Sequence, residues 1–237
     1  MKNHFNFKKF SVNQGNCAMK VGTDAVLLGA WTSVKPHPQT ILDIGAGTGI
    51  IALMLAQRSQ AEAIDAIEID GDAYEQCVEN FENSLWNDRL FCYHASVLEF
   101  TEEIENKYDL IISNPPFYTT DYKTDSAKRD LARFSDALPF DHLVECVSKL
   151  LSKHGTFAVI IPFKEEEKFI DFASKVHLFP ERILHVKGNS HSEIKRSLIE
   201  FSFEKSNVRF ETLIIETSRH QYTEAYIDLT KDFYLKM

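Results

Sequence analysis

An amide side chain and two prolines stand directly after an apolar run near the middle of the chain. The run Leu110-Ile111-Ile112-Ser113 predicts a strand, and Asn114-Pro115-Pro116-Phe117 follows it without a break. In open parallel sheets, ligands bind at the carboxyl ends of the strands. We therefore expect this tetrapeptide to line a binding site.

The tetrapeptide offers two hydrogen-bond acceptors and an aromatic face. The side-chain oxygen of Asn114 and the carbonyl oxygen of Pro115 suit the two N–H groups of an exocyclic amine such as that of adenine. Such an amine is a poor nucleophile because its lone pair is delocalised into the ring. Two hydrogen bonds pull electron density toward the nitrogen and aim the lone pair at an electrophilic carbon. The Phe117 ring adds a stacking surface worth ~1–3 kcal/mol.

This arrangement indicates alkylation of a planar, conjugated nitrogen without a separate strong base. The predicted catalytic residues are Asn114, Pro115 and Phe117. The structural alternative is a rigid Pro-Pro turn that merely ends a strand.

A glycine-rich loop forms the second unit that can do chemistry. Asp43-Ile44-Gly45-Ala46-Gly47-Thr48-Gly49 lies between an apolar run and residues 50–58, which have helical spacing. Three glycines let the chain turn sharply and let a ligand touch the backbone. Dinucleotide sites use a related loop, followed about 20 residues later by an acid. The loop therefore predicts a cofactor site, although its spacing alone is ambiguous.

Two details favour S-adenosyl-L-methionine over a dinucleotide. An acid, Asp43, precedes the first glycine inside the strand, and the chain also carries the tetrapeptide suited to alkylation. At the end of the second strand, Glu68 is the predicted acceptor of both ribose hydroxyls, whereas Asp70 is expected to cap the next helix. The residues predicted from this loop to bind the cofactor are Asp43, Gly45, Gly47, Gly49 and Glu68.

Strands that alternate with helices must position these residues. Apolar runs predict strands at 41–44, 63–69, 90–93, 108–113, 156–161, 182–186, 198–203 and 212–215. Helical spacing predicts helices at 23–31, capped by Thr23 or Asp24, at 50–58, at 72–82, capped by Asp72, at 140–151 and at 165–176. This alternation predicts an α/β fold with a mostly parallel, seven-stranded sheet and helices on both faces. We expect one domain, in which residues 1–40 cover the ligand edge of a core formed by residues 41–237.

With these motifs, the sequence resembles the Rossmann-like N6-adenine methyltransferases, and among them the bacterial tRNA1(Val) (adenine(37)-N6)-methyltransferase family. The resemblance rests on the glycine loop, Asn114 to Phe117, Phe7-Lys8-Lys9-Phe10, Met19 to Trp31 and Leu229 to Tyr234, and it covers nearly the whole chain. It implies a class I methyltransferase fold, S-adenosyl-L-methionine as cofactor, and methylation of the adenine beside the anticodon of a valine tRNA. It also implies a monomeric cytoplasmic enzyme.

The resemblance adds further cofactor residues. It implies that Lys20 and Thr23, with Asp24, lie near the methionine end of the cofactor, although a basic strand end and a helix cap would explain them equally well. Relatives often place an Asp after the third strand to bind the cofactor adenine, whereas this chain reads His94-Ala95-Ser96-Val97. We expect the backbone of Ala95 or the hydroxyl of Ser96 to take that role, and Asn114 to contact the cofactor as well.

Composition restricts the class of protein and the kind of RNA contact. No stretch of about 20 apolar residues and no signal peptide is present, and the four cysteines lack the spacing of a metal site or a disulfide framework. We therefore expect a soluble, non-secreted protein without a metal. The net charge of -9 excludes a uniformly basic coat, so any RNA contact must be local.

Basic residues gather in three groups. The first includes Lys8, Lys9 and Lys20; the second comprises Lys123, Lys128, Arg129 and Arg133; the third comprises Lys187, Lys195 and Arg196. The second group lies in a polar stretch, 118–133, that we interpret as a lid whose cations hold phosphates beside a flipped-out adenine. Our predicted RNA contacts are Lys8, Lys9 and the second group, whereas solvated faces are the alternative for all three groups.

Three other functions compete with tRNA methylation. A glutamine amide is also planar and conjugated, so a protein glutamine N5-methyltransferase is one, and an rRNA adenine-N6 methyltransferase is another. An inactive cofactor-binding module that binds RNA is the non-enzymatic alternative. About forty residues precede the glycine loop, which leaves little room for the sizeable helical domain that glutamine methyltransferases carry there. The intact Asn114, Phe117 and glycine loop argue against the inactive module.

Overall fold

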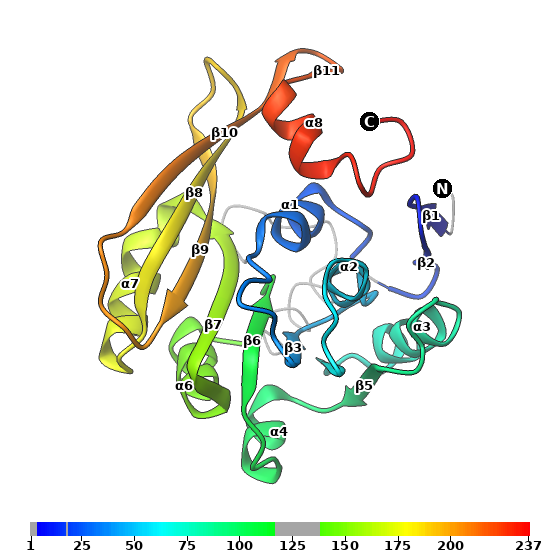
Figure 1. Cartoon of the computed structure of the whole chain (residues 1–237), viewed down its shortest axis with the longest axis vertical. Helices are drawn as coiled ribbons and strands as arrows, with labels where there is room; N and C mark the ends of the chain where they lie inside the picture. Colours follow the sequence, from blue (N-terminus) through cyan, green and yellow to red (C-terminus); the bar gives the residue numbers. More distant parts are fainter. Residues whose placement is uncertain (1–3, 18, 117–137) are drawn as a thin grey trace, which may run out of the picture.

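The computed structural model describes residues 4–17, 19–116 and 138–237, and a mixed sheet runs through the middle of the molecule (Figure 1). In these ranges the sheet has nine strands in the order β11-β10-β8-β9-β7-β6-β3-β4-β5. The strands are β3 (Thr40–Ile44), β4 (Ala63–Glu68), β5 (Leu90–His94), β6 (Tyr108–Ser113), β7 (Leu151–Pro162), β8 (Phe179–Asn189), β9 (Ile194–Ser202), β10 (Arg209–Ser218) and β11 (Gln221–Tyr222).

Helices cover both faces of this sheet. One face carries α1 (Thr23–Trp31), α2 (Ile50–Arg58), α3 (Gly71–Glu82) and α8 (Glu224–Thr230), and the other carries α4 (Val97–Glu103), α6 (Phe140–Leu150) and α7 (Glu166–Lys175), which follows the 3-10 turn Phe163–Glu165 (Figure 1). Successive side chains of the central strand β6 point alternately to the two faces of the sheet. Leu110 and Ile112 pack into the core under α1 and α2, and Ile111 packs into the core under α6 and α7. Strand β6 is therefore buried on both faces, which is why its apolar residues do not alternate with polar ones.

The sheet is mostly parallel, as predicted, but it is larger than seven strands. Strands β3 to β7 pair in parallel, while β9 runs antiparallel between β7 and β8. Beyond β8, the parallel strand β10 and the two-residue β11 extend the edge. This extension satisfies the backbone groups of β8, which would otherwise form an open edge.

The N-terminal residues are more regular than the sequence suggested. A small hairpin pairs β1 (His4–Asn6) with β2 (Ser11–Asn13), in place of an irregular basic segment. It lies beside the end of the chain, because the backbone of Phe7 bridges that of Tyr234 and the Lys8 N–H donates to the Phe233 carbonyl at 2.8 Å. Figure 1 shows β1 and β2 on the same side of the molecule as the last residues of the chain, which follow α8.

The predicted caps of α1, Thr23 or Asp24, were wrong. For α3 the sequence offered two caps, of which Asp70 is confirmed and Asp72 was wrong. The cap of α1 is Gly22, with no side-chain hydrogen bond, because Asp24 instead forms an ion pair with Arg196 at 2.8 Å. The cap of α3 is Asp70, whose Oδ1 accepts from the Ala73 N–H at 2.8 Å, so Asp72 lies inside the first turn. The helices themselves lie where their spacing predicted them.

Candidate functional site

The glycine loop and the Asn-Pro-Pro motif leave adjacent parallel strands at the same level. Strand β3 pairs with β6 so that Ile44 lies opposite Ser113. The Ser113 hydroxyl, which is buried, donates to the Ile44 carbonyl at 2.9 Å. The next residues along the two strands, Gly45 and half-buried Asn114, therefore start at neighbouring points on the carboxyl edge. Phe117 lies outside the described residues.

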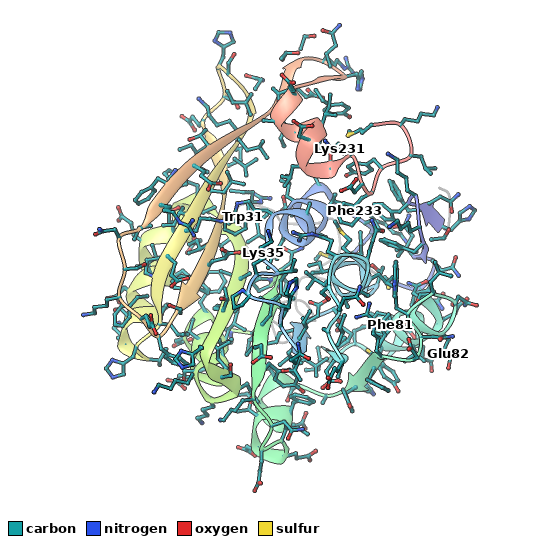
Figure 2. The ribbon with its side chains drawn as sticks, viewed as in Figure 1. Trp31, Lys35, Phe81, Glu82, Lys231 and Phe233 are labelled. Atoms are coloured by element: carbon teal, nitrogen blue, oxygen red, sulfur yellow. The ribbon has the colours of Figure 1, made fainter. Side chains whose placement is uncertain are left out.

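The glycine loop adopts backbone angles that are unfavourable for residues with a side chain. Gly45, Gly47 and Gly49 have φ values of 74°, 56° and 75°, in the left-handed region. At Gly45 and Gly47, no described atom lies within 4 Å of where a Cβ would be, so the loop presents bare backbone to open space. At Gly49, a Cβ would meet the ring of Phe81 at 2.5 Å, because the start of α2 packs tightly on α3 (Figure 2).

Glu68 holds this loop against the end of β4. Its side chain is 9% exposed, and Oε2 accepts from the Gly47 N–H at 2.7 Å while Oε1 accepts from the Asp70 N–H at 2.9 Å. The backbone of the loop is tied to the same strand, since Gly45 N–H donates to the Ile67 carbonyl at 2.9 Å. The carboxylate thus lies between the glycine loop and the turn after β4.

Asp43 is a buried carboxyl beneath the loop. Its Oδ2 accepts from the Ala52 N–H at 3.2 Å, while Oδ1 has no hydrogen-bond partner among the described residues. Burial raises the pKa of Asp43 to about 7; the bond from Ala52 lowers it, and the charge of Glu68 adds to the rise. Asp43 therefore ties β3 to α2 and sets where the chain turns.

The N-terminal segment lies against the same loop. Asn80 of α3 donates to the carbonyls of Thr48 and Asn13, each at 2.9 Å, and so joins the glycine loop to the residue that ends β2. Farther along, burial and the nearby charge of Glu68 raise the pKa of the Cys17 thiol to about 11. These contacts bring the segment before α1 to the carboxyl edge of β3 and β4.

Lys20 and Thr23, which the resemblance places at the cofactor, are exposed at the start of this region. The Lys20 ammonium donates to the Gln14 carbonyl, and the Gln14 side chain accepts from the Val21 N–H at 2.9 Å. Thr23 is the first residue of α1. The charges of Glu68 and Lys20 act in opposite directions on the pKa of the Cys17 thiol, Glu68 raising it and Lys20 lowering it.

After β5, the predicted adenine ligands have other partners. The Ala95 N–H donates to the Glu68 carbonyl at 3.2 Å. The Ser96 hydroxyl donates to Glu99 Oε2 at 2.7 Å and accepts from the Glu99 N–H at 3.2 Å, which forms a capping box for α4. The spacing Ser96-x-x-Glu99 is the sequence signature of such a box and would have predicted this helix.

Sequence reasoning also missed an aromatic pair at this point. The His94 ring stacks on that of Tyr74 with centroids 5.2 Å apart and planes at 18°, and its Nε2 lies 3.0 Å from the Ile69 carbonyl oxygen. His94 and Tyr74 come from β5 and α3, which are neighbours at the carboxyl edge. Only the pairing of these distant segments reveals the stack, because neither residue belongs to a local motif.

The predicted RNA-contact residues divide into two sets. Lys8 donates to the carbonyls of Lys231 and Met237, whereas Lys9 is exposed on the turn after β1. The predicted lid, 118–133, with Lys123, Lys128, Arg129 and Arg133, lies outside the described residues. In the third group, Arg196 pairs with Asp24 and Lys187 donates to the Ser190 carbonyl at 3.2 Å.

The described residues contain neither a membrane-spanning helix nor a cluster of metal-ligating side chains. Over residues 4–17, 19–116 and 138–237, no helix is long and apolar enough to cross a membrane. In the same ranges, no group of three or more His, Cys, Asp or Glu side chains is arranged to hold a metal ion.

Solved structures share this fold at low identity. A predicted O-methyltransferase from Agrobacterium tumefaciens superimposes with a TM-score of 0.67 at 19% identity, covering 89% of this chain and 96% of that chain. The ribosomal protein L11 methylase from Lactobacillus delbrueckii subsp. bulgaricus gives 0.58 at 16% identity, covering 82% of this chain and 84% of that chain. These similarities confirm the predicted class I methyltransferase fold.

Sequence comparison identifies the family. Residues 19–138 match the family model of the methyltransferase small domain. The tRNA1(Val) (adenine(37)-N6)-methyltransferases of Flavobacterium psychrophilum and Flavobacterium johnsoniae are 62% and 63% identical, each over 98% of this chain and 100% of the relative. The protein of the same name from Bacteroides fragilis is 47% identical over 98% of both chains. The chain therefore belongs to the tRNA1(Val) (adenine(37)-N6)-methyltransferase family, as its motifs predicted.

Proposed function

We propose that this chain transfers a methyl group from S-adenosyl-L-methionine to N6 of adenine 37 in tRNA1(Val). One observation carries the proposal: Ile44 and Ser113 are register partners, so Asn114 starts beside the glycine loop. A methyl donor in the loop and an amine held by Asn114 would then lie side by side. Relatives that share more than 60% identity carry this activity in their names.

The residues of the loop fit the cofactor. Bare backbone at Gly45 and Gly47 faces open space, and the Glu68 carboxylate beside it has one accepted hydrogen bond on each oxygen, which leaves acceptor capacity for hydroxyl groups. When bound, S-adenosyl-L-methionine supplies an electrophilic methyl group on a sulfonium. Gly45, Gly47 and Gly49 shape the loop, Glu68 accepts from the ribose, and Asp43 anchors the loop from below.

Four further cofactor contacts belong to the proposal. Lys20 and Thr23 lie near the methionine end, at the start of α1. The cofactor adenine binds after β5, through Ala95 and Ser96. The Ala95 N–H and the Ser96 hydroxyl already have partners among the described residues, so the adenine amine would donate to the Ala95 carbonyl or to the second lone pair of the Ser96 hydroxyl.

Asn114 and Pro115 hold and polarise the amine. Asn114 is half-buried and Pro115 is buried, so their oxygens act where competing water is restricted. Two accepted N–H bonds fix the amine and direct its lone pair, which converts a delocalised amine into a nucleophile without removing a proton first. The Phe117 ring stacks on the adenine, and Lys9, Lys123, Lys128, Arg129 and Arg133 contact the RNA backbone. Lys8 instead donates to the carbonyls of Lys231 and Met237.

The test is methyl transfer into tRNA that lacks this modification. Labelled S-adenosyl-L-methionine and total tRNA from a strain without the enzyme are incubated with the wild type and with Asn114→Ala, and the nucleosides are analysed by mass spectrometry. We expect N6-methyladenosine with the wild type and at least a 10²-fold lower rate with the variant, in line with the loss of a group that acts in the transition state. A urea unfolding midpoint equal to that of the wild type shows that the variant still folds.

The alternatives predict other products. Label in ribosomal RNA or in a protein glutamine, with none in tRNA, would contradict the substrate and retain the cofactor. Cofactor binding without turnover on any of these acceptors would favour an inactive binding module. The proposal also includes a monomeric cytoplasmic enzyme, and light scattering at working concentration measures the oligomeric state directly.

A further inference from the structure

A cavity lies between β1, the start of α1 and the last residues of the chain. It has a volume of about 590 Å³, within the ~300–1,000 Å³ typical of ligand pockets. We call it the terminal pocket. Its walls come from β1, the start of α1, the end of β10, β11, α8 and the residues after α8; they include Phe5, Thr23, Glu216, Tyr222, Tyr226 and Tyr234.

The terminal pocket lies at the same edge of the sheet as Asn114. Strands β6 and β7 are parallel, β9 runs against β7 and β8, and β10 is parallel to β8, so β10 points the same way as β6. Glu216, near the carboxyl end of β10, is therefore on the Asn114 edge. On the other wall, Thr23 begins α1, and its neighbour Asp24 is paired to Arg196, which lies opposite the last residue of β7.

Aromatic rings dominate the lining and are fixed in place. Tyr222 and Tyr226 have centroids 5.2 Å apart, and Phe5 meets Tyr234 edge-on at 6.2 Å. Tyr226 is buried, and this burial together with the neighbouring Tyr234 raises the pKa of its hydroxyl. Beneath this wall, Phe233 is 2% exposed and lies beside α1 (Figure 2). Tyr222 is 38% exposed, so its ring can take a partner.

The polar groups of the lining select for a base rather than a phosphate. Glu216 carries a negative charge into the pocket, which disfavours a phosphate and suits a donor such as an exocyclic amine. Its Oε1 accepts from the His220 N–H at 3.3 Å, which orients the carboxylate. Cations lie at the margin instead, with Lys236 in the lining and Arg219 exposed on the turn between β10 and β11.

We propose that the terminal pocket holds one unpaired nucleobase of the RNA substrate, other than the adenine that is methylated, stacked on Tyr222 with its exocyclic amine donating to Glu216. The proposal rests on the proposed function, because an RNA that presents a flipped adenine to Asn114 must also unstack neighbouring bases. Aromatic side chains are the usual acceptors of such bases in single-stranded RNA. The pocket is thus a second contact that fixes the register of the RNA.

The experiment compares Tyr222→Ala with two matched controls. Tyr222→Phe keeps the ring, and Phe210→Ala removes an exposed ring from β10 outside the pocket. Affinity for an unmodified tRNA transcript is measured by fluorescence anisotropy, and affinity for S-adenosyl-L-methionine by calorimetry. We expect Tyr222→Ala to bind the transcript about tenfold more weakly, as the loss of one stacked base predicts. Cofactor affinity and both controls should match the wild type.

Transcripts with single abasic nucleotides beside the target locate the base. One abasic position should weaken binding to the wild type by about tenfold and have no further effect on Tyr222→Ala, because both changes remove the same stack. At that position, Glu216→Gln should bind about fivefold more weakly to a base with an exocyclic amine and normally to uracil. This variant keeps the assay decisive if Tyr222→Ala unfolds.

Equal affinities of Tyr222→Ala and wild type, or abasic penalties that are the same in both at every position, would overturn the terminal pocket as a base site. Normal methylation by the wild type in that case leaves the proposed function standing. A wild type that neither binds nor methylates the transcript would overturn both.

Discussion

The hydroxyl of Ser113 donates a 2.9 Å hydrogen bond to the main-chain carbonyl of Ile44, and this bond joins the two strands that carry the chemistry. Ile44 precedes the glycine loop and Ser113 precedes Asn114. Both residues are almost fully buried, so the bond is protected from water. It holds the start of the glycine loop beside Asn114.

Replacing Ser113 with Ala should lower the unfolding free energy slightly and should also lower the rate of methyl transfer. The lost hydrogen bond costs about 1 kcal/mol in the free energy of unfolding, whereas a small shift of Asn114 lowers kcat by about tenfold. Urea unfolding and steady-state methyl transfer measure the two effects. Ser152→Ala is the control, since Ser152 donates to Asp109 at 3.2 Å from the start of β7, far from the carboxyl edge. Equal kcat values for the two variants would show that the bond has no positioning role.

Alanine substitutions at Gly49 and Gly47 should distinguish a glycine needed for stability from one needed for cofactor binding. Gly49→Ala forces a Cβ to within 2.5 Å of Phe81 in addition to left-handed strain, so we expect a loss of about 3 kcal/mol in unfolding free energy. Gly47→Ala meets no described atom within 4 Å and should lose about 1 kcal/mol from strain alone.

Gly47→Ala, the variant with the smaller loss of stability, should lose affinity for the cofactor. The new methyl group of Gly47→Ala projects into the space proposed for S-adenosyl-L-methionine, so calorimetry should show weakened binding by a protein that is still folded. Wild-type cofactor affinity in Gly47→Ala would place the cofactor elsewhere. Chemical denaturation without cofactor supplies the stability comparison for both variants.

Asp43 should make stability fall as the pH rises. Its pKa is about 7 in the folded protein and ~3.9 in the unfolded chain, so between these values the folded state holds a proton that the unfolded state has lost. The free energy of unfolding therefore decreases from about pH 4 to pH 7 and is level above it, by about 4 kcal/mol for this group.

Asp43→Asn removes this group and keeps an oxygen that accepts from the Ala52 N–H. Burial also raises the pKa values of Asp65 and Glu200, and their contribution of the same sign remains in both proteins. Urea unfolding should show that the free energy of unfolding changes less between pH 5 and pH 8 in the variant than in the wild type. Identical differences would mean that Asp43 titrates in its ordinary range.

Local sequence patterns predicted the central strands and helices, whereas features that depend on long-range contacts, such as the cap of α1, were not predicted. Strand β6 and helix α2 have the bounds that their apolar spacing predicted, because both are buried and carry a continuous signal. The same kind of short motif identified Gly45, Gly47 and Asn114, and the structure places Asn114 beside the glycine loop. The cap of α1 failed because Asp24 is drawn to Arg196, 172 residues away, and no local pattern contains that partner.

Helix α4 was missed although its capping box, Ser96-x-x-Glu99, is a local signal, whereas other missed elements depend on the ends of the chain. The β1–β2 hairpin and α8 are short and amphiphilic, so their signals are weak until the bridge between Phe7 and Tyr234 brings them together. The His94–Tyr74 stack and the terminal pocket arise in the same way, from segments that are distant in sequence. Motifs thus identified the reaction, whereas the surroundings of the motifs required the structure.

Lys8 and Lys9 are adjacent in sequence, yet their variants should behave differently. The Lys8 ammonium donates to the carbonyls of Lys231 and Met237 and so holds the end of the chain, whereas Lys9 is exposed. Lys8→Ala should lower the free energy of unfolding by about 1 kcal/mol. Lys9→Ala should leave stability unchanged and reduce the slope of log K for tRNA binding against log salt by about 0.7–0.9, the contribution of one phosphate contact.

Thermal unfolding and salt titration of tRNA binding distinguish these roles. A changed salt slope in Lys8→Ala, with unchanged stability, would show that Lys8 leaves the two carbonyls when RNA binds. An unchanged slope in Lys9→Ala would remove Lys9 from the RNA interface, so that with a net charge of -9 the electrostatic attraction would have to come from other local clusters. The two neighbouring lysines thus test whether the paired termini serve folding, RNA binding or both.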